Sequence, residues 1–102
     1  MTSPPAEEFR AAFASSAGGV MTEEAGAITG EMELLCRPEA GRLQVAVRYA
    51  GTDDWYTVSG GPLRVRDAPG SVEGRILQHL RTPGPVVDGN EEAITLERFP
   101  EA

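Results

Sequence analysis

The sequence predicts an α+β domain: a two-layer sandwich in which an antiparallel four-stranded meander and a C-terminal hairpin are covered on one face by two helices. Three observations lead to this fold class. Apolar and polar residues alternate between residues 27 and 58, which is the period of a half-buried strand. Runs rich in Gly, Pro and Asp interrupt the alternation, as the turns of a meander do. Apolar residues at helical spacing flank this region on both sides.

The first helix is expected over residues 3–17. Ser3 can cap it, the prolines that follow are tolerated in a first turn, and the next two glutamates suit the positive end of the helix dipole. Phe9 and Phe13 are four residues apart and share one face of a helix. The pair Gly18–Gly19 ends it. This thin apolar stripe requires a surface on which the helix can dock.

The connector 20–26 has no predicted element, and the meander begins with a long strand over residues 27–37. Four-residue loops at 38–41, 51–54 and 59–62 place one set of side chains on a single apolar face. That set is Ile28, Met32, Leu34, Cys36, Leu43, Val45, Val47, Tyr49, Tyr56, Val58, Leu63 and Val65.

The same loop lengths define a register. Leu34 faces Val45 in the first hairpin, and Tyr49 faces Tyr56 in the second. Val58 then faces Leu63 in the third. A register slip of one residue would turn a whole strand to the other face, so the agreement of three hairpins supports the arrangement.

The second helix follows the meander. Its apolar stripe has helical spacing and comprises Val72, Ile76, Leu77 and Leu80. Ser71 can cap it, residues 82–85 end it, and Gly74 inside it suggests a close contact with the sheet. A last hairpin starts at residues 86–87, turns at 88–90 and returns through Ile94 and Leu96.

Composition limits the class of protein. The chain has 102 residues and a formal charge of −7, and we expect one domain with flexible tails at residues 1–5 and 99–102. The negative charge argues against nucleic acid as a partner, because phosphate binding requires clustered cations. The single Cys36 excludes an internal disulfide, and the chain has neither a long apolar run nor a signal-like N-terminus. These features predict a cytoplasmic protein with no membrane segment.

No motif predicts a catalytic centre. The single histidine, His79, sits beside the stripe of the second helix without a predicted orienting partner, and Cys36 falls on the apolar strand face. One cysteine and one histidine cannot form a Cys/His metal site. We therefore expect no catalytic residue, no cofactor and no metal.

A partner-binding surface is predicted on the opposite face of the sheet. The register that buries both tyrosines turns Trp55 outward, and the residues that we expect to bind a partner are Arg48, Trp55, Arg64 and Arg66. Arg66 can stack on Trp55, and Glu31 can pair with Arg48. Trp and Arg are the residue types most enriched at interface hot spots, although a solvated sheet face with cross-strand pairs has the same pattern.

These observations favour a small acidic protein-interaction or regulatory module, a monomer or a homodimer, whose partner presents acidic or planar groups. The alternative is a small-molecule-binding or enzymatic domain with a pocket between the helices and the sheet, lined by Tyr49, Tyr56 and His79. A third hypothesis, binding of single-stranded nucleic acid on the Trp55 face, is opposed by the charge. The element order is similar to that of small bacterial chaperone-like and immunity-like α+β domains, without a shared motif.

Overall fold

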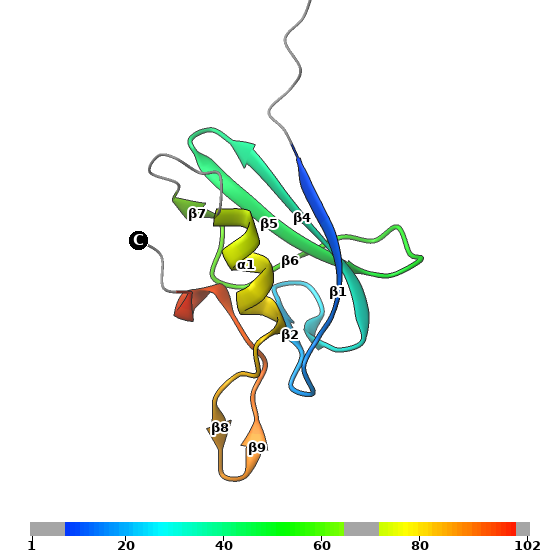
Figure 1. Cartoon of the computed structure of the whole chain (residues 1–102), viewed down its shortest axis with the longest axis vertical. Helices are drawn as coiled ribbons and strands as arrows, with labels where there is room; N and C mark the ends of the chain where they lie inside the picture. The colour runs from blue at the N-terminus through cyan, green and yellow to red at the C-terminus, as the bar shows by residue number, and fades with distance from the viewer. Residues whose placement is uncertain (1–7, 65–71, 100–102) are drawn as a thin grey trace, which may run out of the picture.

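The computed structural model describes residues 8–64 and 72–99. Its main sheet is antiparallel, and its last two strands both pair with β5. The strands of this sheet are β1 (Phe9–Ala14), β4 (Glu31–Glu39), β5 (Arg42–Tyr49), β6 (Tyr56–Thr57) and β7 (Leu63–Arg64). Helix α1 (Val72–Arg81) lies in front of this sheet in Figure 1.

Two small hairpins and a short 3₁₀ helix complete the described structure. The hairpins are β2 (Val20–Thr22) with β3 (Gly26–Ile28), and β8 (Val86–Val87) with β9 (Asn90–Glu91); the 3₁₀ helix η2 is Leu96–Arg98. The connector 20–26 therefore forms most of a hairpin that the sequence did not reveal. The expected long strand is broken at Gly30, whose φ of 119° is a conformation that favours glycine.

The α+β class and the antiparallel sheet are confirmed, and so is the apolar face of its central strands. In β4 and β5, Met32, Leu34, Val45 and Val47 are at most 2% exposed. They pack with α1 and with the C-terminal residues Ile94, Leu96 and Phe99 in one core. Alternation predicted this face correctly because side chains in a strand have a strict period of two.

The predicted register of the β4–β5 hairpin is wrong by two residues. Leu34 lies opposite Val47 rather than Val45, and Glu39 lies opposite Arg42, so the loop has two residues and not four. Ala40 and Gly41 both have positive φ, as a tight hairpin turn requires. A shift by two keeps every side chain on its face, and the apolar pattern therefore did not reveal the error.

The arrangement of β6 and β7 also differs from the prediction. Tyr56 lies opposite Val47 rather than Tyr49, and Leu63 lies opposite Leu43 rather than Val58. Both short strands line the same edge of β5 instead of forming a hairpin with each other. Tyr49 is consequently 37% exposed and not buried, and Tyr56 is half-buried. Val65 lies outside the described residues.

The expected first helix is wrong: within residues 8–17 the chain forms strand β1, antiparallel to β4. Phe9, Ala11 and Phe13 lie opposite the buried residues of β4, and Phe13 is 7% exposed. A spacing of four residues puts two side chains on one face of a helix and equally on one face of a strand. The segment forms a strand rather than a helix because its backbone can hydrogen-bond to the free edge of β4.

One helix, not two, covers the sheet among the described residues. Helix α1 has the expected bounds, and Val72, Ile76 and Leu80 are its buried residues. A Cβ on Gly74 would meet no atom within 4 Å, so this glycine does not mark a close helix–sheet contact. Ser71, expected as the cap, lies outside the described residues.

The last hairpin is present in a shorter form. β8 and β9 have two residues each, and they turn at Asp88–Gly89. The return strand does not reach Leu96: Ile94 makes a single bridge to Val20, and Leu96 begins η2. Phe99, the first residue of the predicted C-terminal tail, is buried. Residues 1–5 and 100–102 lie outside the described residues.

Candidate interaction surface

The candidate surface is centred on Trp55, which directly precedes β6. Tyr56 lies opposite Val47 on the core side of the sheet. Because successive side chains of a strand point to opposite faces, Trp55 is directed to the polar face. Its ring is half-buried there without contributing to the core.

Two arginines contact the Trp55 ring. The guanidinium carbon of Arg48, from β5, lies 4.5 Å from the ring centroid, and that of Arg10, from β1, lies 5.7 Å from it. Both distances are within the range of a cation–π interaction, which contributes about 0.5–1 kcal/mol at an exposed site. We call these three residues the Trp55 platform.

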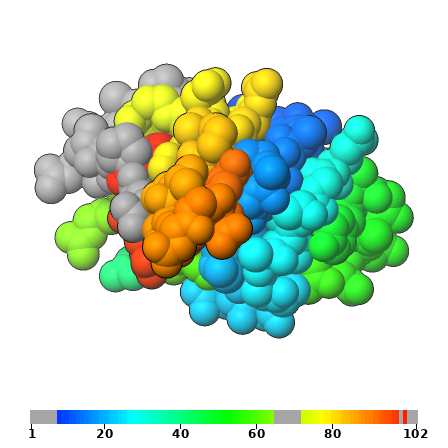
Figure 2. All heavy atoms as spheres, turned by 90° about the horizontal axis from the view of Figure 1, so that it is seen from below, coloured from blue at the N-terminus to red at the C-terminus, as the bar shows by residue number. Residues whose placement is uncertain are grey.

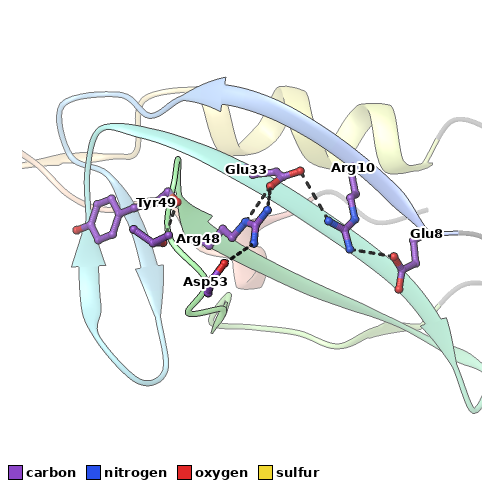
Figure 3. A network of polar contacts seen from close by, with 7 residues as sticks. Glu8, Arg10, Glu33, Arg48, Tyr49 and Asp53 are labelled. Atoms are coloured by element: carbon purple, nitrogen blue, oxygen red, sulfur yellow. Dashed lines mark hydrogen bonds and ion pairs between the residues drawn. The ribbon is translucent and has the colours of Figure 1, made fainter.

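Carboxylates lie beside both arginines of the Trp55 platform (Figure 3). Glu33 Oε1 accepts hydrogen bonds from Arg48 Nε at 2.8 Å and Nη2 at 2.6 Å, while its other oxygen lies 4.0 Å from Arg10 Nη1. Glu8 adds a contact of 3.3 Å to Arg10, and Asp53 one of 3.8 Å to Arg48. Short charge-assisted hydrogen bonds of the kind that Glu33 makes fix the orientation of the Arg48 guanidinium before any partner arrives, whereas Arg10, with a side chain 48% exposed, is held less firmly.

The structure brings together only some of the predicted partner-binding residues. Arg48 and Trp55 are in contact. Arg64 lies opposite Arg42, on the same face but six residues along β5 from Arg48, which corresponds to about 20 Å. Arg66 lies outside the described residues, so its predicted stacking on Trp55 stays a prediction.

Sequence reasoning missed two members of this site. The sequence predicts a helix that includes Arg10, whereas the alternation Phe9-Arg10-Ala11, interpreted as a strand, places Arg10 on the polar face. Glu33, rather than Glu31, binds Arg48, because the true register places Glu33 opposite it.

A hollow lies beside α1, away from the Trp55 platform. It has a volume of about 280 Å³ and is lined by Arg75, Gln78, His79, Thr82 and Phe99. His79 Nε2 lies 2.8 Å from the carbonyl oxygen of Thr95, an atom that can only accept, so this nitrogen carries the proton. Neither Tyr49 nor Tyr56 lines the hollow, and it does not lie between helix and sheet. It is therefore not the pocket that the alternative function requires.

Cys36 is a buried thiol among the apolar residues of β4. Desolvation by burial, with a smaller contribution from the charge of Glu73, raises its pKa to about 12. A thiol with such a pKa stays protonated at neutral pH and cannot act as a nucleophile.

Comparisons of the chain with protein-family models, with curated proteins and with solved structures found no match. The similarity in element order to small chaperone-like and immunity-like domains also loses its basis, since the described chain starts with a strand where that order starts with a helix. In the part of the chain that the structure describes, no helix is long and apolar enough to cross a membrane.

Proposed function

We propose that this protein is a non-catalytic protein-interaction or regulatory module, and that it binds its partner through the Trp55 platform. The observation that carries the proposal is a half-buried tryptophan, outside the core, in contact with two arginines, one of which, Arg48, is held by short hydrogen bonds to Glu33. Tryptophan and arginine contribute most to binding when a partner removes them from water, and the preoriented Arg48 loses little side-chain entropy on binding.

The charges of the platform narrow the chemistry of the partner. Among the acidic or planar groups that the sequence favours, a planar group fits the geometry better, because Glu8, Glu33 and Asp53 already oppose the two arginines. An aromatic or peptide plane can stack on Trp55 and on the exposed side of Arg10, whose side chain is 48% exposed. A carboxylate of the partner would compete with the carboxylates already present.

Arg64 extends the proposed surface along the sheet, and Arg66 stays part of the surface as the sequence predicts it. An interface of standard size covers about 800 Å² on each partner. A partner that lies along β5 therefore reaches Arg64 at the far end of the same face. The protein acts as a monomer or a homodimer, and the single, buried Cys36 fits a reducing, cytoplasmic setting.

The proposal is tested first by affinity capture with the wild-type chain and with Trp55→Ala as bait, and then by titrating the purified captured protein. Trp55 is the single indole of the chain, so a partner without tryptophan can be followed through its emission and through acrylamide quenching. We expect an emission shift, protection from acrylamide and at least tenfold weaker binding of Arg10→Ala. Arg81→Ala, an exposed arginine on α1, is the matched control and should bind as wild type does. A partner that binds with emission and quenching unchanged, and equally well to Arg10→Ala, refutes the proposal.

A further inference from the structure

The segment 84–92 forms a finger that projects from the rest of the molecule. It contains β8, β9 and the two-residue turn between them, and it extends beyond α1 at the lower end of Figure 1. In Figure 2, which views the molecule from this end, the finger is the orange group of atoms in front. Asp88 and Gly89 have φ values of 54° and 82°, the pair of positive angles of a type I′ turn.

The finger carries two large apolar side chains that contact little of the protein. Val86 is 67% exposed and Val87 46%, and with Tyr49 they are the exposed large hydrophobic residues of the described chain. Adjacent residues of a strand point to opposite sides, so the finger presents a valine on each face. Removal of these side chains from water would favour binding, whereas the folded monomer gains little from them.

The base of the finger is fixed to the body. The Glu91 carboxylate accepts hydrogen bonds from the Ser16 hydroxyl and the Gly18 N–H, both at 2.6 Å. Within the finger itself, the backbone N–H of Glu92 donates to the Pro85 carbonyl at 2.8 Å. A side chain on Gly84 would collide with the Glu92 carbonyl, so this close approach requires glycine. The contacts of Glu91 thus attach the base of the finger to the body, and the other two contacts close the finger on itself.

The finger is also acidic throughout. Between residues 82 and 97 the chain has no lysine, arginine or histidine, and Asp88 and Glu92 are exposed beside the valines. This pattern disfavours a second copy as the occupant, because two fingers would bring like charges together. It favours a partner of opposite charge.

We infer that the finger is a second interaction element, independent of the Trp55 platform, whose two valines enter an apolar cleft bordered by lysine or arginine side chains on a protein partner. The valines supply the apolar contact, the acids select the basic border, and the fixed base limits the entropy lost on binding.

The partner is identified by a photo-crosslinking amino acid placed at Val87 of the full chain in its native host, with the same amino acid at the exposed Glu39 as control. We expect a crosslinked protein from position 87 that position 39 does not give. That protein, once purified, is then titrated calorimetrically. The isosteric double variant Val86→Thr, Val87→Thr keeps the β-branched shape and should bind at least tenfold more weakly, whereas Val86→Ile, Val87→Ile should bind as tightly as wild type or more tightly.

Two further measurements separate this interaction from the platform. Asp88→Asn retains a residue that tolerates the turn but removes a charge, and it should weaken binding at low salt and reduce the salt dependence. The threonine variant should keep the wild-type urea midpoint, and Trp55→Ala should bind the crosslinked protein normally. No crosslink at position 87, or a partner that binds the threonine variant as tightly as wild type, overturns the inference.

Discussion

Leu80 is the residue at which the contribution of α1 to stability can be measured most directly. Its side chain is 0% exposed, so Leu80→Ala removes a fully buried side chain and leaves a cavity between helix and sheet. Such changes cost about 2–5 kcal/mol, and we expect about 3 kcal/mol here. A domain of this size has roughly 5–15 kcal/mol of stability in total, so the loss is a large fraction of it.

The assay is urea unfolding followed by far-UV circular dichroism. With a slope of about 1.5 kcal/mol per molar urea, a loss of 3 kcal/mol lowers the midpoint by about 2 M. The slope should not change, because the variant keeps the fold.

Two variants on the same helix are the controls. Leu77→Ala has the same chemistry at a half-buried position, and it should cost roughly half as much as Leu80→Ala. Gly74→Ala adds a methyl group in open space within a helix and should raise stability by about 0.5–1 kcal/mol. A cost below about 0.5 kcal/mol for Leu80→Ala, or equal costs for both leucines, would show that α1 does not pack as described.

Three other predictions follow from individual residues. Hydrogen bonds from the Ser16 hydroxyl and, to a smaller extent, from the Gly18 N–H hold the pKa of Glu91 below its ordinary value of 4.5. The ionised Glu91 therefore stabilises the folded state above that pH, and this stabilisation is lost as the pH falls. Glu91→Gln should flatten the acid side of a plot of melting temperature against pH. With its pKa raised to about 12, Cys36 should react with iodoacetamide at pH 8 only as fast as the protein unfolds, which mass spectrometry can follow. Gly60 has a φ of 96° and no space for a side chain beside the backbone of Glu97, so Gly60→Ala should cost about 1–3 kcal/mol in the same urea titration.

The sequence alone was sufficient to predict α1 and the apolar faces of β4 and β5. Val72, Ile76 and Leu80 recur at helical spacing between clear end signals, and Met32 and Leu34 alternate with polar neighbours. These patterns depend on local periodicity and do not require knowledge of the pairing partner. The outward direction of Trp55 followed from the same periodicity.

The tertiary structure decided what periodicity leaves open. Phe9 and Phe13 satisfy a helix and a strand equally, and only the free edge of β4 selects the strand and brings Arg10 to Trp55. Registers that differ by two residues bury the same side chains, so the tight turn at Ala40–Gly41, and not the apolar pattern, selects the one that joins Glu33 to Arg48. The Trp55 platform thus depends on strand pairings between residues far apart in the sequence, whose choice is set by hydrogen bonding across strands and by turn geometry.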